Sequence, residues 1–213
     1  MNDMLRNILE ELIKVKVETL GLVYDFLRKL NADKTGGFLR KFKLFLREEL
    51  VEKIIYHTFE YLRLISNGTE IIISETDGQS TIAHAENAFP GYIDSDFVNY
   101  GIDVKGKSTK KTKVQVFEQI KDGTFTQIFG SFGENRDRLC LTQSQIIRFV
   151  KDHSKWLRTD GYGTFFFFKE KGKYFVADVR WSEGKLTVRV GCLPHDNVWF
   201  ADDLRRLVVP QFC

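Results

Sequence analysis

The chain has 213 residues, of which 43% are hydrophobic and 29% charged, and its formal net charge is +3. This composition is typical of an ordinary globular protein and excludes a low-complexity or collagen-like chain. The small net charge does not by itself require a polyelectrolyte partner.

The first third of the chain has the apolar spacing of two amphipathic helices. Residues 31–37 interrupt the pattern, and Asn67 with Gly68 ends it. We therefore predict an N-terminal helical hairpin over residues 1–68, followed by an α+β domain over residues 69–213. The apolar surface of both helices is wide, so it either packs on its own domain or serves self-association or an unknown protein partner.

The next segment is expected to begin with a β-hairpin, formed by residues 70–74 and 80–85 around Asp77-Gly78. Residues 86–112 are predicted to be irregular. Thr112 with Gln115, and Thr124 with Gln127, both match the Thr-x-x-Gln capping pattern of a helix start. These pairs predict two short helices, although strands remain possible there.

A well-defined helix is predicted to begin after Thr142, because Gln145 completes a capping box and the apolar residues that follow keep a helical period. It should end near Arg158. Three strands are then expected over residues 164–169, 174–181 and 186–192. The four-residue linker at 182–185 sets a register in which Trp181 faces Leu186, and this register places apolar partners, Cys192 included, on one buried face.

The run of four phenylalanines from 165 to 168 predicts a strand that is buried on both faces. Phe166 and Phe168 should join the main core, and a helix from elsewhere in the chain should cover Phe165 and Phe167. A last strand is expected over residues 205–209. The predicted fold class is α+β: a mainly antiparallel sheet of five or six strands packed by helices, with the N-terminal helical hairpin.

Several motifs between residues 88 and 209 resemble those of a known family. They are FPGYIDSDF (89–97), DGTFTQIFG (122–130), LCLTQSQII (139–147), WLRTDGY (156–162), VWFADD (198–203) and VVPQ (208–211). Together they resemble a family of uncharacterised bacterial proteins, of the kind abundant in small-genome candidate-phylum bacteria. The resemblance covers a little over half of the chain and implies no activity, so it assigns no functional residue.

One acidic pattern is enzyme-like. Asp94 and Asp96 precede Asp103 and Lys105, and an acidic residue followed by Asp-x-Lys is the skeleton of many metal-dependent nucleases. In such enzymes the carboxylates hold a divalent ion and the lysine orients or activates water. Adjoining strands normally carry this motif, whereas the residues before Asp103 indicate a loop. A nuclease is therefore the second alternative, and solvated loop charges are the simpler interpretation.

Five lysines gather in a short segment that contains no acidic residue. They are Lys105, Lys107, Lys110, Lys111 and Lys113. Such a cluster creates a local positive field that suits the phosphate backbone of RNA or DNA. No aromatic residue is interleaved with the lysines to stack on bases, so the alternative of a flexible solvated loop stays open.

No motif for a metal, a nucleotide or another cofactor is present, and we expect none. The three cysteines are widely separated, no signal peptide or membrane span is expected, and these features predict a cytoplasmic protein with reduced thiols. The leading hypothesis is a non-enzymatic binding or interaction protein of unknown partner. The first alternative is a nucleic-acid-binding protein that uses the loop from Lys105 to Lys113.

Overall fold

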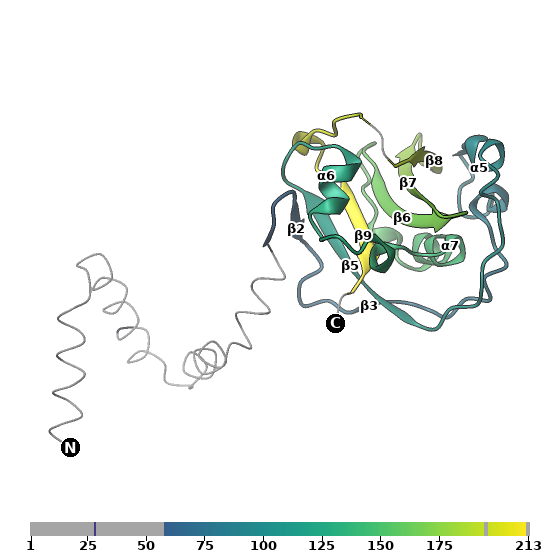
Figure 1. Cartoon of the computed structure of the whole chain (residues 1–213), viewed down its shortest axis with the longest axis horizontal. Coiled ribbons are helices and arrows are strands. Elements are labelled where there is room, and N and C mark those ends of the chain that lie inside the picture. Colours follow the sequence, from purple (N-terminus) through teal and green to yellow (C-terminus); the bar gives the residue numbers. More distant parts are fainter. Residues whose placement is uncertain (1–27, 29–57, 194–195, 212–213) are drawn as a thin grey trace, which may run out of the picture. The chain divides into compact units, whose positions relative to one another are not determined.

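Nine strands form one mixed sheet in the computed structural model, which describes Arg28 and residues 58–193 and 196–211 (Figure 1). The strands are β1 (Thr58–Phe59), β2 (Leu62–Leu64), β3 (Ile71–Ile73), β4 (Tyr92–Ile93), β5 (Thr112–Gln119), β6 (Thr164–Glu170), β7 (Lys173–Ser182), β8 (Lys185–Cys192) and β9 (Arg206–Pro210). The α-helices of the same described residues are α5 (Asp96–Asn99), α6 (Phe125–Gly130) and α7 (Gln143–Asp152). Short 3-10 helices are η1 (Ile82–His84), η2 (Arg136–Leu139), η3 (Ser154–Trp156) and η4 (Ala201–Asp203).

The strand order is β1-β2-β5-β9-β6-β7-β8-β4, and β3 pairs with β5 beside this path. β9 runs parallel to β6, and β4 runs parallel to β8. The predicted α+β class, a mainly antiparallel sheet packed by helices, is therefore wrong: the sheet is mixed, and the three α-helices of the described residues are short. The reason is that β9 returns to the middle of the sheet, and local sequence patterns carry no signal for such a distant pairing. Residues 1–57 of the predicted helical hairpin, apart from Arg28, lie outside the residues that the structure describes.

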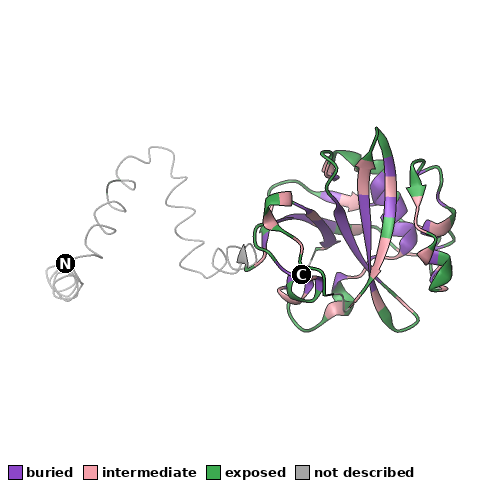
Figure 2. Ribbon diagram, turned by 90° about the horizontal axis from the view of Figure 1, so that it is seen from above, coloured by how far each residue is buried: buried purple, intermediate pink, exposed green. Residues whose placement is uncertain are grey.

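The phenylalanine run in β6 is buried on both faces of the sheet, as predicted. Phe166 belongs to the core cluster that includes α7, and its ring lies 5.4 Å from that of Phe149. Phe165 belongs to the cluster on the other face, where its ring lies 5.0 Å from that of Phe125 in α6. The helix expected to cover this second face is thus α6. Figure 2 shows the resulting buried interior along the central strands.

The predicted register of the β7–β8 hairpin is confirmed. Trp181 lies opposite Leu186, and Asp178 lies opposite Arg189. Leu186 is buried, as expected for the apolar face. Cys192 is an exception, because it is exposed at the end of β8 and not in the core. The predicted burial of Cys192 is wrong because the hydrophobic core does not extend to the last residue of β8.

The helix predicted up to residue 66 is wrong over residues 58–64, which form β1, a turn and β2. β2 pairs with β5, so Leu62 is fully buried. β2 has only three residues, which is too few for the alternation of apolar and polar side chains in a strand to be distinguished from the helical spacing of the apolar residues before it. Tertiary pairing decides their conformation.

The predicted hairpin of residues 70–85 is also wrong, because β3 pairs with β5 and residues 82–84 form η1. Of the two Thr-x-x-Gln pairs, only Thr124 caps a helix, with the complete capping box at the start of α6. Thr112 begins the strand β5, the alternative that had stayed open, and its hydroxyl accepts a hydrogen bond of 2.8 Å from Gln145. The four-residue Thr-x-x-Gln pattern alone is therefore not specific.

The helix after Thr142 is confirmed as α7, which starts with the predicted capping box. It ends at Asp152 and is followed by η3, so it is shorter than expected. Residues 86–112 contain β4 and α5 in otherwise irregular backbone. β4 forms one edge of the sheet, beside β8.

Candidate functional site

A basic groove of about 590 Å³ lies on the part of the sheet formed by β4, β7 and β8. Its charged lining consists of Arg180, Lys185 and Arg189, with Glu183 as the one acidic side chain. Tyr92 from β4 also lines it. The volume falls within the roughly 300–1,000 Å³ of small-molecule sites in proteins.

The register of three strands explains why these side chains share one face. Tyr92 pairs with Thr187, and Thr187 pairs with Arg180, so the three form a row across β4, β8 and β7. Arg189 lies two residues farther along β8 and therefore points to the same face. Leu186 and Val188 alternate with them and are buried on the other face. The groove is thus the outer face of a hairpin whose inner face is core.

The three cations of the groove differ in their partners. Arg180 is held by Asp178, whose Oδ2 accepts a hydrogen bond of 2.8 Å from Nε. The side chains of Lys185 and Arg189 are exposed, and neither side chain makes a hydrogen bond or ion pair with another residue that the structure describes. Arg189 lies directly across from Asp178 in the register, yet the carboxylate bonds Arg180 instead. Two cations of the groove are therefore available to a ligand.

Asp178 is a buried carboxylate with one unsatisfied oxygen. It is 6% exposed, and its Oδ1 has no hydrogen-bond partner among the described residues. Burial raises the pKa of this carboxyl, while Arg180, Arg205 and Arg189 oppose the rise. Gly163 makes room for it, since a Cβ on that residue would lie 1.8 Å from Oδ1. Asp178 therefore positions Arg180 from within the protein and is screened from solvent.

Replacing Asp178 with asparagine is expected to change the pH dependence of stability. The raised pKa means that the folded protein binds the Asp178 proton more tightly than the unfolded chain does. The protonated carboxyl therefore contributes its full stabilisation of the fold at pH values below 3.8, the pKa in the unfolded chain. This contribution is lost as the pH rises through the pKa in the folded protein. Urea unfolding over a pH series should show the wild type losing stability relative to Asp178→Asn as the pH rises above that value. The exposed Asp202 provides the control. A similar change in Asp202→Asn would show that burial is not the cause.

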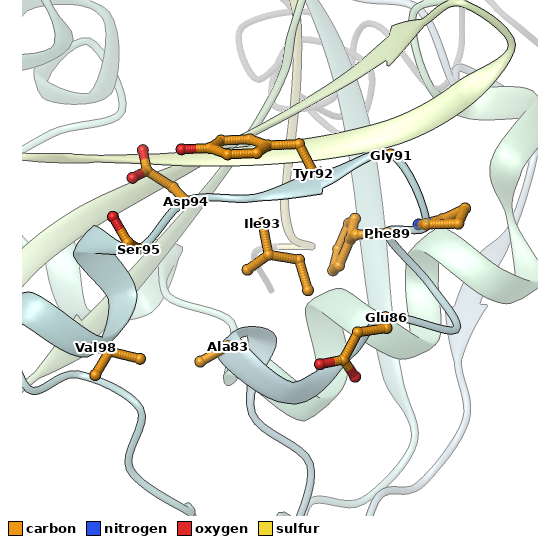
Figure 3. Close-up of a pocket in the computed structure, with 10 residues that line it drawn as sticks. Ala83, Glu86, Phe89, Gly91, Tyr92, Ile93, Asp94, Ser95 and Val98 are labelled. Carbon is orange, nitrogen blue, oxygen red and sulfur yellow. The ribbon is translucent and has the colours of Figure 1, made fainter.

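A second pocket, of about 400 Å³, lies on the other side of β4 (Figure 3). Figure 3 shows Ile93 pointing toward Ala83 and Glu86 and the ring of Tyr92 on the other face of β4, and Tyr92 contributes to the lining of both the groove and this pocket. Asp94 also lines this pocket, but its carboxylate accepts backbone hydrogen bonds of 3.1 Å from Asp96 and 3.4 Å from Val190. This carboxylate thus fixes the chain between β4 and α5.

A third cavity, of about 130 Å³, contains Cys140 and Gln143. Burial raises the pKa of the Cys140 thiol to about 12, so the thiol is protonated at neutral pH and is a poor nucleophile. The buried Gln143 accepts a hydrogen bond of 3.0 Å from the backbone of Ile82 and donates one of 2.6 Å to the backbone of Ile102. This residue therefore ties α7 to two loops.

The residues of the predicted nuclease pattern are only partly brought together. Asp94 and Asp96 are adjacent at the start of α5, where the Asp96 carboxylate accepts a hydrogen bond of 3.0 Å from Asn99. Asp103 instead lies beside His84, with 4.0 Å between its Oδ2 and the His84 Nε2. Lys105 follows in an exposed loop. Within residues 58–193 and 196–211, no three His, Cys, Asp or Glu side chains form a group that could hold a metal ion.

The predicted lysine cluster lies apart from the basic groove. Its loop runs beside residues 76–79, where the backbone of Gly106 donates a hydrogen bond of 2.9 Å to Gly78. Lys113 is on β5 and forms an ion pair with Glu70. Gly106 shares the third cavity with Glu170 near the β6–β7 turn, whereas the groove lies at the β7–β8 turn. The part of the loop around Gly106 and the groove are therefore near opposite ends of β7.

Sequence reasoning missed the groove, although one signal was present. The confirmed register already placed Arg189 on the outward face of the hairpin. The contribution of Tyr92 had no sequence signal, because it depends on the parallel pairing of a two-residue strand.

The fold and the groove together define a mixed-sheet domain with an open basic surface site. No protein-family model, no curated protein and no solved structure matches the chain. The resemblance over residues 88–209 thus stays a prediction. No helix of the described residues combines the length and the apolarity that crossing a membrane requires.

Proposed function

We propose that this protein is a non-enzymatic binding protein whose basic groove holds an anionic, phosphate-bearing ligand. The observation that carries the proposal is the exposed pair of Lys185 and Arg189, which line one groove and whose side chains form no direct ion pair with a described residue. Guanidinium groups form paired hydrogen bonds with phosphate oxygens, and lysine adds a compact positive charge. Arg180 contributes a third cation in a fixed position.

The other two hypotheses receive less support from the geometry. The lysine loop from Lys105 to Lys113 stays the alternative site for an anionic partner, but none of the three pockets described above is lined by these lysines. A metal-dependent nuclease at Asp94, Asp96 and Asp103 would need the three carboxylates to converge, and the partners of Asp103 differ from those of the other two. We also propose a cytoplasmic location, which the free thiols of Cys140 and Cys192 support.

Binding of tripolyphosphate tests the proposed function. Isothermal titration at low ionic strength should detect binding to the wild type, and the double variant Lys185→Gln/Arg189→Gln should bind about tenfold more weakly or worse. The matched control is Lys110→Gln/Lys111→Gln, which removes the same charge from the lysine loop. We expect this control to bind like the wild type.

Amide chemical shifts locate the bound anion independently. Resonances of residues 187–189 and 91–92 should move on titration, because they surround the groove. Absence of binding, or an equal loss in both double variants, would show that the groove is not a phosphate site.

A further inference from the structure

We propose that the anionic ligand is a single-stranded nucleic acid, with phosphates at Lys185 and Arg189 and one base stacked on Tyr92. This inference rests on the proposed function, because it names the ligand class of the same groove. It also gives Tyr92 a role in stacking, which a site for phosphate alone would not require.

The exposure of Tyr92 is the first argument. This residue is 49% exposed, although it belongs to a strand whose next residue, Ile93, packs against the core. Its ring is not paired with any other aromatic ring of the described residues, unlike most of the phenylalanines. Figure 3 shows its ring on the face of β4 opposite to the side chain of Ile93, although Tyr92 also contributes to the lining of the pocket of about 400 Å³. One ring face is thus available to an incoming planar group.

The spacing of the row is the second argument. Tyr92, Thr187 and Arg180 occupy neighbouring positions on three adjacent strands, which lie about 4.8 Å apart. The backbone positions of Tyr92 and Arg180 are therefore about 10 Å apart across the row. An aromatic platform beside a positively charged groove is how proteins bind single strands without reading their sequence. Thr187, between the two, offers a hydroxyl to a base or a sugar.

The combination favours a single strand over other polyanions. In a duplex the faces of the bases are stacked on one another, so a duplex could use the cations but not the ring. An acidic peptide or an anionic lipid surface likewise lacks a base to stack. Each of these polyanions should therefore bind without any contribution from Tyr92.

Fluorescence anisotropy with a labelled oligouridine of about ten residues tests the inference on the full chain, since one small module covers roughly 4–16 nucleotides. Tyr92→Leu should weaken binding by about fivefold to 150-fold, the range for loss of one base stack, whereas Tyr92→Phe should bind like the wild type. Both variants should bind tripolyphosphate normally and keep the wild-type unfolding midpoint.

Salt dependence supplies a second measurement. Two neutralised phosphates predict a slope of about −1.4 for the logarithm of the binding constant against the logarithm of salt concentration. The slope should approach zero in Lys185→Gln/Arg189→Gln and stay unchanged in Lys110→Gln/Lys111→Gln. A duplex of equal length, polyglutamate and phosphatidylserine vesicles should all compete poorly with the oligonucleotide.

The outcomes separate the two proposals. If tripolyphosphate binds in the groove but Tyr92→Leu leaves oligouridine binding unchanged, the single-strand inference is overturned and the phosphate site stands. The same holds if a duplex, the acidic peptide or the vesicles compete equally well. If only the lysine-loop variant loses oligonucleotide binding, the nucleic acid lies on that loop and not in the groove. If neither ligand binds, both proposals fail.

Discussion

Replacing Gly163 with alanine is expected to lower the free energy of unfolding by about 3 kcal/mol, because the new methyl group would occupy the space of the Asp178 carboxylate. The added Cβ would lie 1.8 Å from Oδ1 and 2.8 Å from Cγ. The backbone cannot move away easily, since the carbonyl of Gly163 accepts a hydrogen bond of 3.2 Å from Arg206. Asp178 is short, buried and bonded to Arg180, so it would have to break that pairing to rotate. Urea unfolding measures the effect.

A double-mutant cycle identifies the cause of this loss. In the Asp178→Ala background, the cost of Gly163→Ala should shrink to within about 1 kcal/mol, because the opposing carboxylate is gone. Gly130 provides a matched control, since nothing lies within 4 Å of the Cβ that it would gain. Alanine there should be neutral or slightly stabilising. An equal cost of Gly163→Ala in both backgrounds would mean that another contact, not Asp178, excludes the side chain.

Replacing Gln143 with leucine is expected to cost about 3 kcal/mol, although the two side chains are of similar size. The amide of Gln143 satisfies the buried N–H of Ile82 and the carbonyl of Ile102, and its Nε2 lies 3.3 Å from Glu170 Oε1. Leucine would leave the two backbone groups without a partner in the interior, and each unsatisfied group costs about 1–3 kcal/mol. Chemical unfolding should report the loss, and hydrogen exchange should accelerate at the amide of Ile82.

Gln127 provides the comparison for this second variant. It completes the capping box of α6, but it is exposed, so water can replace its hydrogen bonds. Leucine at residue 127 should cost about 1 kcal/mol or less. Similar losses at residues 127 and 143 would argue that the burial of the two backbone groups bonded by Gln143 does not account for the effect.

The parts of the fold that could be predicted are those set by neighbouring residues. The starts of α6 and α7 follow from a threonine and a glutamine three residues apart, and the register of β7 and β8 follows from their short linker. The two buried faces of β6 follow from four consecutive phenylalanines. Each of these features is set by residues that lie close together in the chain.

The parts that could not be predicted depend on distant partners. β5 resembled a helix start because nothing near Thr112 reveals that β2, β3 and β9 will pair with it. The same limit applies to the candidate site. Arg180 and Arg189 come from one hairpin and were within reach of sequence reasoning, whereas Tyr92 joins them only through β4.

The position of β9 has a consequence for synthesis of the protein on the ribosome. β9 follows all the other strands in the chain, yet it lies between β5 and β6. Until residue 210 has left the exit tunnel, β5 and β6 have no neighbour on their facing edges, and the apolar side chains beside that gap stay uncovered. The central part of the sheet therefore cannot be completed progressively from the N-terminal end, and the nascent chain presents two unpaired strand edges, which are prone to edge-to-edge pairing, until β9 inserts between them.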